Sequence, residues 1–436
     1  MKGKPIIVGI LIAAMLAVCG LSIFAIWQGV RMAGSDGFNF TLGPIDPVEV
    51  KETEEKTLSV SGPVELKVEN DFGFVAVQPG ADGKVVVSTE KVGWGDSETR
   101  AQQELADLKV LIEQKGNQIR IYLERPPEVD AINFVPSGAY ANFTITVPVE
   151  TSVDLTTWNG EMNLSGTQGD AALNAGFGSV DVQDLTGALT ITASNGRITI
   201  ENIEAGDAAI SLTSEFGDVS MDSVSGGNVT AKSTNGAMTV TNVDASEKLD
   251  VRSDFGNIEI RAGEAGSLDV HASNGRILVE DLGVSGNVII SNDFGDLTLV
   301  DVLSANMDLR TQNGHINVSG SRGTIKAESD FGEVDISAEQ AVVTLISNNG
   351  DVSFAGTLVD GEHMLQSDFG DITLTIPADL ALNLDLKTDL GKITSDIPLT
   401  VSGEIDEHHW TGTINGGGPN LTAATQNGNI TIQTAE

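Results

Sequence analysis

Apolar and polar residues alternate along most of this chain, and a glycine turn interrupts the alternation at regular intervals. In residues 268–279, apolar side chains occupy every second position as far as Asn274, which shares their face. The alternation shifts by one position after Gly275 and resumes with Ile277 and Val279. A period of two is typical of strands with one buried face, and glycine permits a bend between two strands. We therefore expect pairs of short strands, each pair joined at a glycine.

The glycine turn has two versions, which alternate strictly along residues 151–436. One version contains Phe-Gly, and its phenylalanines are Phe177, Phe216, Phe255, Phe294, Phe331 and Phe369. The other contains Asn-Gly, and its asparagines are Asn159, Asn195, Asn235, Asn274, Asn313 and Asn349. Successive turns are 18–21 residues apart, and a fixed period of this kind is typical of stacked repeats. The pattern predicts an all-β fold, a β-helix-like solenoid of repeats of about 20 residues.

The number of repeats in one turn of the solenoid, or rung, decides which side chains stack on each other. With one repeat in each rung, Phe lies next to Asn; with two repeats, about 40 residues, Phe stacks on Phe and Asn on Asn. Identical side chains stack well between neighbouring strands, so we favour the rung of two repeats. In that arrangement we expect Phe255, Phe294, Phe331 and Phe369 to point inward and to touch their counterparts.

Residues 58–150 lack the repeat and predict an N-terminal β region that caps the solenoid. Residues 97–107 form the one convincing helix of this region, which Asp96 or Ser97 can cap. Alternating strands on either side of residues 115–117 predict a hairpin. Bare strand edges template aggregation, and terminal repeats need caps. We therefore expect the helix and the hairpin to cover the first rung.

The chain begins with a segment, residues 1–34, that is suited to a membrane. Ile6 to Trp27 is an uncharged apolar run long enough to cross a bilayer core, and a cleavable signal peptide usually has a shorter one. The lysines before the run favour a cytoplasmic N-terminus, which places the rest of the chain outside the cytoplasm. We expect a signal-anchor, one transmembrane helix in the cell membrane, followed by a linker at residues 35–57. Whether the segment is instead cleaved, or lipidated at Cys19, stays open.

The charge of the chain is strongly negative and excludes several classes of partner. The 436 residues contain 62 Asp and Glu against 24 Lys and Arg, and no acidic residue precedes Asp36. The part that follows the apolar run therefore repels nucleic acid and anionic lipid head groups. The only cysteine is Cys19, so disulfides within the chain cannot stabilise the body.

Three further features of the sequence occur together in this chain. They are the entry strand at residues 145–148, the serial Asn-Gly and Phe-Gly turns, and a Gly-rich run at residues 416–421 before the last turn at residues 427–430. Together these features resemble a bacterial family of β-strand-repeat proteins named as adhesins, whose function is otherwise unknown. The resemblance covers roughly residues 58–436. It implies a β-solenoid and a surface role, and it supplies no catalytic residues.

No familiar catalytic motif accompanies the repeats. The sequence has no Gly-x-Ser-x-Gly, His-Glu-x-x-His or Walker A motif. We therefore expect a structural or surface-interaction module, adhesin-like, with no enzyme activity and no cofactor, whose partner is a glycan or a protein of the cell envelope. Two alternatives stay open. One is a scaffold that self-assembles through an open C-terminal edge at Asn429 to Thr434, and the other is a solenoid enzyme that acts on polysaccharide.

Acidic residues recur at the Phe-Gly turns and are the candidate metal ligands. Asp254, Asp293, Asp330 and Asp368 precede a phenylalanine, and Asp296, Glu333 and Asp371 follow a glycine. In rungs of two repeats, each column would place like charges about 4.8 Å apart, the spacing of strands. Carboxylate oxygens at this spacing predict weak binding of Ca²⁺ or Mg²⁺. The alternative is a solvated acidic edge that keeps a β-protein soluble.

Overall fold

The structure, a computed structural model, describes residues 47–125, 137–401 and 406–435. The chain divides into two compact units, Met1–Val48 and Glu49–Glu436. The predicted transmembrane segment in residues 1–34 lies outside the described residues, and so does most of the linker. Within the described ranges, no helix has the length and apolar character needed to cross a membrane.

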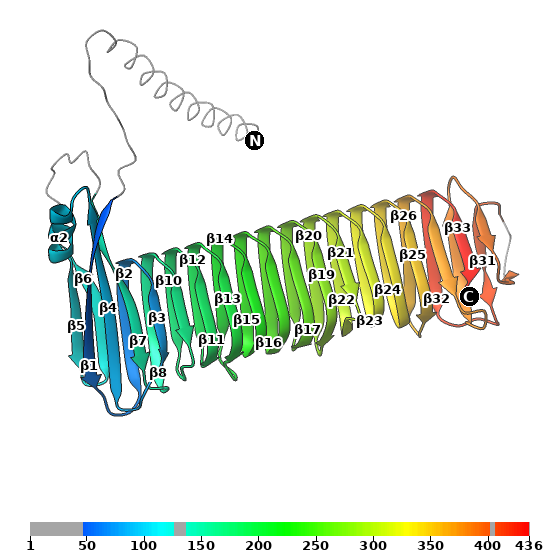
Figure 1. Ribbon diagram of the computed structural model, residues 1–436. Helices are drawn as coiled ribbons and strands as arrows, with labels where there is room; N and C mark the ends of the chain where they lie inside the picture. Colours follow the sequence, from blue (N-terminus) through cyan, green and yellow to red (C-terminus); the bar gives the residue numbers. More distant parts are fainter. Residues whose placement is uncertain (1–46, 126–136, 402–405, 436) are drawn as a thin grey trace, which may run out of the picture. The chain divides into compact units, whose positions relative to one another are not determined.

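Every repeat forms one rung of a parallel β-solenoid (Figure 1). A rung has a first arm, which ends at the Phe-Gly or Asn-Gly turn, and a second arm, which begins after the glycine. Neighbouring rungs pair in parallel with their turns in register, so Asn235 lies between Phe216 and Phe255. The rung is therefore a single repeat, and our prediction of a two-repeat rung is wrong.

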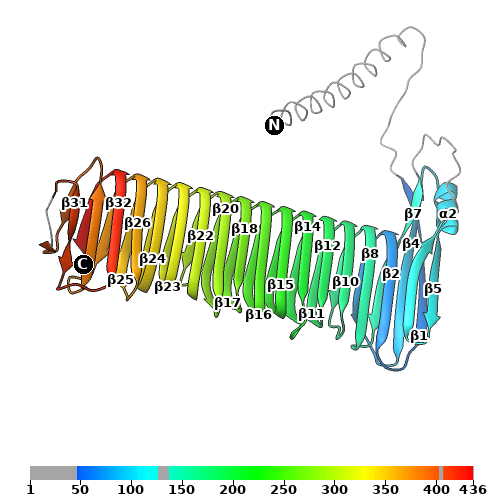
Figure 2. The same cartoon turned by 180° about the vertical axis from the view of Figure 1, so that it is seen from behind.

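The two arms of the rungs form two continuous stacks of strands, seen from both sides of the body in Figures 1 and 2. The first arms are β2 (Val64–Phe72), β8 (Thr151–Asn159), β10 (Ala171–Phe177), β12 (Leu189–Asn195), β14 (Ile210–Phe216), β18 (Leu268–Asn274), β20 (Asn287–Phe294), β22 (Leu303–Asn313), β26 (Glu362–Phe369) and β32 (Asn420–Asn427). The second arms are β3 (Val75–Pro79), β9 (Met162–Ser165), β11 (Val180–Thr186), β13 (Ile198–Glu204), β17 (Ile258–Ala265), β19 (Ile277–Val284), β21 (Leu297–Val300), β25 (Val352–Leu358), β27 (Ile372–Ile376) and β33 (Ile430–Thr434). Four long strands run from a second arm into the first arm of the next rung: β15 (Val219–Asn235), β16 (Met238–Phe255), β23 (Ile316–Phe331) and β24 (Val334–Asn349).

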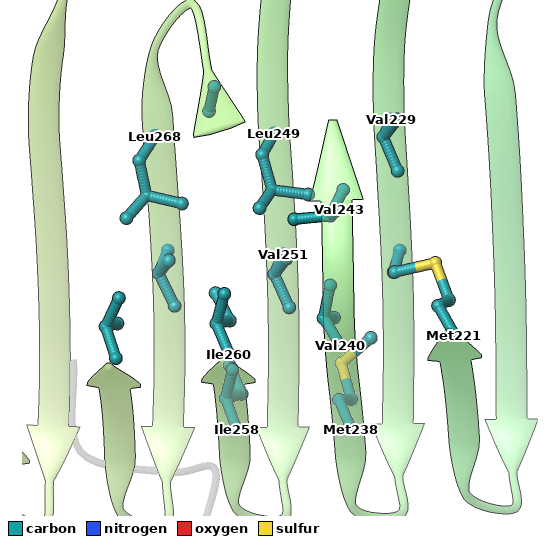
Figure 3. Packing of buried hydrophobic residues seen from close by; sticks show 14 of the residues in the cluster. Met221, Val229, Met238, Val240, Val243, Leu249, Val251, Ile258, Ile260 and Leu268 are labelled. Atoms are coloured by element: carbon teal, nitrogen blue, oxygen red, sulfur yellow. The ribbon is translucent and has the colours of Figure 1, made fainter. Parts of the chain in front are cut away.

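The space between the arms is filled by aliphatic side chains, which lie in columns along the solenoid. One cluster of buried residues extends through the whole body. In its middle part, Leu249 lies beside Leu268, and Met238 lies beside Ile258 on the neighbouring rung (Figure 3). These are alternate residues of their strands, so the period of two predicted correctly which side chains form the core.

Strands from the residues before the repeats cap one end of the solenoid, whereas the helix that was expected to cover the first rung packs against these strands instead. β6 (Gln118–Glu124) pairs with β2 on the side opposite β8, and β7 (Gly138–Val147) pairs with β3 on the side opposite β9. The remaining elements are β1 (Val48–Ser59), β4 (Lys84–Gly95), α2 (Glu98–Asp107) and β5 (Lys109–Lys115). β5 and β6 form the expected hairpin. Both arms of the first rung are therefore paired, which removes an edge that would template aggregation.

The helix α2 begins where the sequence predicts. Ser97 is the N-cap, and its hydroxyl oxygen accepts a hydrogen bond from the N–H of Arg100 at 3.3 Å. Ala101 and Leu105 lie on one face of the helix and are buried. This face packs against β4 and β7, so α2 covers part of the cap.

At the C-terminal end, the strands are not arranged in the order of the sequence. β32 lies between β26 and β28 (Leu382–Thr388), and β33 lies between β27 and β29 (Ile393–Ser395). β31 (His409–Ile414) pairs antiparallel with β28 and with β30 (Thr400–Val401). The self-assembly alternative placed an open edge at β33, but strands pair with β33 on both sides.

Candidate interaction surface

The Phe-Gly turns direct their rings outward, which contradicts our prediction of inward phenylalanines. At one of these turns, the alternation of buried and exposed positions ends at Ser253, which is 1% exposed, and Phe255 is 55% exposed. Phe294, Phe331 and Phe369 are 54%, 59% and 56% exposed. The physical reason is the one-repeat rung: each phenylalanine shares its column with asparagines, and an inward column would bury their amides at a cost in free energy.

Phenylalanine and asparagine alternate along the outer corner of the solenoid, and we call this column the aromatic–amide row. In spatial order, the row is Phe72, Asn159, Phe177, Asn195, Phe216, Asn235, Phe255, Asn274, Phe294, Asn313, Phe331, Asn349, Phe369 and Asn427. All of its rings are between 43% and 59% exposed. Because a ring lies on every second strand, the rings recur at about 9.6 Å, twice the strand spacing.

The exchange of strand order at the C-terminal end preserves this alternation. Along the sequence, the turn at Leu390 follows the turn at Phe369, which would place two apolar residues on neighbouring rungs. Insertion of β32 puts Asn427 between them: the N–H of Leu390 donates to the carbonyl oxygen of Gln426 at 2.9 Å. Leu390 is 71% exposed, so it ends the row as an apolar residue in a phenylalanine position. The alternation in space is kept where the sequence order alone would break it.

The inner side of the same corner is alike in every rung. The glycines stack in one column, and a Cβ on Gly295 would lie 2.2 Å from the carbonyl oxygen of Gly275. Next to them lies a column of small buried residues, many of which carry a hydroxyl; the hydroxyl of Ser347 donates to the carbonyl oxygen of Gly332 at 2.8 Å. Glycine is therefore required at the bend. This column of small buried residues, called the hydroxyl column below, was not predicted from the sequence, although its members all stand two positions before the Phe or Asn.

The acidic residues that precede the phenylalanines lie beside the aromatic–amide row on alternate rungs. They are Asp254, Asp293, Asp330 and Asp368. The intervening rungs carry neutral residues: the carboxylate of Asp330 accepts a hydrogen bond from the amide of Asn348 at 2.9 Å, and Asp293 and Asp368 each accept one from a glutamine. Carboxylates of this column are thus about 9.6 Å apart, twice the strand spacing. The predicted spacing of the cation column is wrong, because it assumed the two-repeat rung.

The acidic residues that follow the glycines contact the neighbouring rung. Asp296 and Asp371 accept hydrogen bonds from the backbone N–H groups of His315 (2.9 Å) and Asn429 (2.7 Å). The carboxylate of Glu333 lies 3.9 Å from Nδ1 of His315. In the part of the chain that the structure describes, no three His, Cys, Asp or Glu side chains come together as a metal site requires. Weak binding of Ca²⁺ or Mg²⁺ stays a prediction, and the geometry on which it rested is not the one observed.

The outward faces of the arms carry ion pairs between rungs. The guanidinium of Arg252 contacts Asp250 at 2.7 Å and Asp269 at 3.1 Å, and its hydrogen bond to Asp250 raises the pKa of Arg252. Arg261 and Arg310 pair in the same way with carboxylates of their own rung and the next. Such exposed pairs add little stability.

A groove of about 910 Å³ lies between the β5–β6 hairpin and the outward face of the first rungs. Lys67 Nζ lies 3.0 Å from a carboxylate oxygen of Asp154, and Arg120 Nε lies 2.9 Å from one of Glu69. The hydrogen bond to Asp154 raises the pKa of Lys67, and the hydrogen bond from Arg120 lowers the pKa of Glu69. Lys67 and Arg120, two of the cations that border the groove, are therefore already bound to carboxylates, so the groove is a weaker candidate site than the row.

One Ser–His contact lies on the outward face and is a candidate for nucleophilic catalysis. Nδ1 of His271 lies 2.8 Å from the hydroxyl oxygen of Ser291 on the next rung. The neighbours of this pair in the same column are Arg252 and Arg310. A nucleophilic serine needs a histidine that is oriented by a carboxylate or a similar acceptor. Among the described residues His271 contacts no carboxylate, and the carboxylates nearby are paired with Arg252 and Arg310, so this pair does not support hydrolase chemistry.

The fold can now be compared with known proteins. The model of the Toastrack family, DUF4097, matches residues 75–275 and 262–433. The chain belongs to the Toastrack family. This confirms the resemblance to a repeat family of unknown function, and no curated protein matches the chain. Two solved structures are similar to it: a candidate cell adhesion protein from Clostridium sporogenes, with 8% identity over 88% of this chain and 100% of that chain, and a candidate adhesin from Bacteroides fragilis, with 11% identity over 88% and 97%; both have a TM-score of 0.15.

Proposed function

We propose that this protein is an adhesin-like binding module, anchored in the cell membrane and exposed outside the cytoplasm, which binds an extended partner along the aromatic–amide row. The row is a side of the body, not an end, so it suits a partner that lies parallel to the solenoid axis. Repeat proteins commonly bind along such extended surfaces.

The observation that carries this proposal is a difference in period between the two sides of one corner. The glycine column and the core columns repeat in every rung, so folding requires only a period of one rung. The outward residues repeat every second rung, from Phe72 to Leu390. Identical rings on neighbouring strands would stack without difficulty, so steric crowding does not impose the alternation. An exposed apolar row with a period that folding does not need is typical of a binding surface.

The charged groups of the body support a role without catalysis. Catalytic acids and bases need pKa values shifted toward their task by burial or by a like charge. The shifts at Glu69, Lys67 and Arg252 come from exposed pairs of opposite charge, which favour the charged forms. A glycosidase would also need two carboxyl groups facing one bond, whereas the carboxylates beside the row, from Asp254 to Asp368, recur regularly with a neutral residue between each two. Incubation of the full-length protein with envelope polysaccharides should therefore release no reducing ends.

Anchoring rests on the apolar run of residues 6–27 and the lysines that precede it. Protease added to intact spheroplasts that contain the full-length chain should digest the body and leave a short membrane-bound stub. A control protein of the cytoplasm should stay intact. Full protection of the body would contradict this part of the proposal.

Binding along the row can be tested with the whole protein. We would express the full-length chain on cells and measure how many cells are retained by immobilised cell-envelope material. The variant with Phe255→Ser, Phe294→Ser and Phe331→Ser should lose retention. A matched control carries Ile289→Ser and Met364→Ser, two exposed apolar residues outside the row, 49% and 41% exposed. Equal loss in both variants would show that general surface hydrophobicity, and not the row, causes retention.

A further inference from the structure

We infer that the ligand of the aromatic–amide row is an extended, uncharged β-linked glycan whose repeating unit is two sugars long; this inference rests on the proposed function and names its ligand. Three features of the row favour this ligand: its period, the chemistry of its two residue types and the charge that surrounds it.

The period requires a ligand that is itself linear and regular. Rings recur at about 9.6 Å, twice the strand spacing, and the exchange of strands β28 and β32 keeps this period at the C-terminal end. In a flat β-linked hexose polymer, every second sugar presents the same face, so equivalent apolar patches recur once in each disaccharide. That repeat is close to the distance between rings. A folded protein partner presents no such repeat, unless it is another solenoid.

The two residue types match the two kinds of surface that a sugar ring offers. The face of a pyranose ring is apolar, because it carries C–H groups, and it packs on an exposed phenylalanine. The rim of the ring carries hydroxyls, and the asparagine amide between two phenylalanines offers both donors and an acceptor. Leu390 stands in a phenylalanine position at the end of the row and is 71% exposed. Leucine keeps the apolar contact but has no π-system, so the position selects C–H groups and not a cation.

The surrounding charge excludes the other regular polymers. Asp254, Asp293, Asp330 and Asp368 lie in the column beside the rings, and the chain has a net charge of −38. A polyanion, such as a phosphate-linked envelope polymer, would be repelled along its length. A second copy of this chain has the same period, but its own acidic column would face this one, and like charges brought together cost free energy. An uncharged polymer meets neither penalty.

The first experiment measures the affinity of the detergent-solubilised full-length protein for oligosaccharides of increasing length. Uncharged β-linked glucose and N-acetylglucosamine oligomers are the probes, with α-linked glucose oligomers as the control of linkage. Affinity for a β-linked series should increase each time two sugars are added, since each addition reaches one more ring. An α-linked series, which coils, should not show this step. Smooth growth without a two-sugar step, or equal affinity for both linkages, would overturn the inference.

The second experiment changes the period and keeps the protein otherwise intact. Asn274→Phe with Asn313→Phe places rings on five successive rungs, from Phe255 to Phe331. If apolar area alone drives binding, this variant should bind more tightly. If the two-rung period matters, it should bind at least about tenfold more weakly, which corresponds to about 1.4 kcal/mol, because the amides between the rings are lost. Unchanged far-UV circular dichroism and melting would show that the variant is folded.

The outcomes separate this inference from the proposed function. In the retention assay with cell-envelope material, loss of binding by the Phe→Ser variant supports the row as a binding surface. If the row binds protein-rich fractions or poly-lysine but no β-linked glycan, the proposed function stands and the glycan inference fails. If sedimentation instead shows that the full-length protein pairs through the row, the ligand is a second copy and the inference also fails.

Discussion

The inner and outer sides of one corner of this solenoid follow different rules. On the inner side, glycines and small residues repeat in every rung, and a Cβ on almost any of the stacked glycines would overlap the backbone of the rung before it. On the outer side, Phe and Asn alternate, and every ring is between 43% and 59% exposed. The inner side is therefore fixed by packing, whereas the outer side is free to vary and nevertheless keeps a strict pattern. A pattern that packing does not impose indicates selection for something outside the molecule.

The largest difference in stability should come from truncation of two phenylalanines, one buried in the core and one exposed in the row. Phe354 in β25 points into the core and is 1% exposed, whereas Phe331 in the row is 59% exposed. Phe354→Ala should lower the free energy of unfolding by about 3–5 kcal/mol, as is usual for buried rings. Phe331→Ala should lower it by about 1 kcal/mol or less. Denaturant unfolding of the two variants checks this, and similar losses would mean that the row is structural.

The glycine column should be nearly as sensitive. Gly295 has φ of +138°, and its Cβ would lie 2.2 Å from the carbonyl oxygen of Gly275. Gly295→Ala combines backbone strain with overlap against backbone atoms, which cannot move aside, so it should cost at least about 2 kcal/mol. Gly116→Ala in the β5–β6 turn is the matched control: its φ is +64°, and it has no atom within 4 Å of the new Cβ. Its cost should be that of backbone strain alone, so a smaller loss for Gly295→Ala than for Gly116→Ala would contradict the close stacking.

The hydroxyl column provides a smaller test with a built-in control. Ser347 donates to Gly332 at 2.8 Å, so Ser347→Ala leaves a buried carbonyl without this partner and should cost about 1–2 kcal/mol. Ser253 occupies the same column, but its hydroxyl is buried without a hydrogen-bond partner among the described residues. Ser253→Ala should therefore be neutral or slightly stabilising. Thermal melts of both variants separate a hydrogen-bonding role from a role of residue size.

The core also holds an imidazole away from this corner: His363, near the start of β26, is 2% exposed. Its Nε2–H donates to the carbonyl oxygen of Val359 at 2.9 Å, and its Nδ1 accepts the N–H of Val343 at 3.3 Å. The contact with Val343 requires the neutral ring, because a protonated Nδ1 cannot accept a hydrogen bond. Burial lowers the pKa of His363 below 6.5, although the neighbouring Glu362 acts in the opposite direction.

This shift predicts a loss of stability in mild acid. The unfolded chain takes up a proton on His363 at a higher pH than the folded chain does. The contribution of His363 is therefore complete above about pH 6.5 and is lost progressively as the pH falls below that value. Urea unfolding at about pH 8 and at about pH 5.5 should show the loss, and His363→Gln should reduce the difference between the two values. An unchanged pH dependence in that variant would assign the effect to other groups.

Local structure was predictable from the sequence, whereas the pairing of strands that are distant in the sequence was not. The N-cap at Ser97, the hairpin at Gly116 and the alternate core residues follow from nearest neighbours along the chain. The rung length was not predictable in this way, because the assumption that identical side chains stack favoured a rung of two repeats. The asparagines were the clue that was missed. A column that contains both phenylalanine and asparagine must face outward, because an inward column would bury the amides. The position of β32 between β26 and β28 depends on strands that meet only in space.

A second bend in the second arm gives the smallest predicted effect. In several successive rungs one residue has a left-handed backbone there, and Asn242, Ala262 and Asp281 occupy this position on three of them, with φ of 52°, 58° and 53°. Asparagine and aspartate tolerate this conformation, because their side chains hydrogen-bond locally, whereas alanine pays about 1–2 kcal/mol for it. Ala262 is therefore the weak member of the column.

Ala262→Asn should relieve part of this strain and stabilise the protein by about 0.5–1 kcal/mol. Asparagine is preferred over aspartate here, since a carboxylate at this position would face Asp281 on the next rung at about 4.8 Å. Ala262→Val is the control and should destabilise, because a β-branched residue fits the left-handed region poorly. Melting temperatures of the three proteins should rank asparagine above alanine and alanine above valine. Because the residue lies away from the row, glycan affinity should be the same in all three, and a change in affinity would mean that the second bend and the row are not independent.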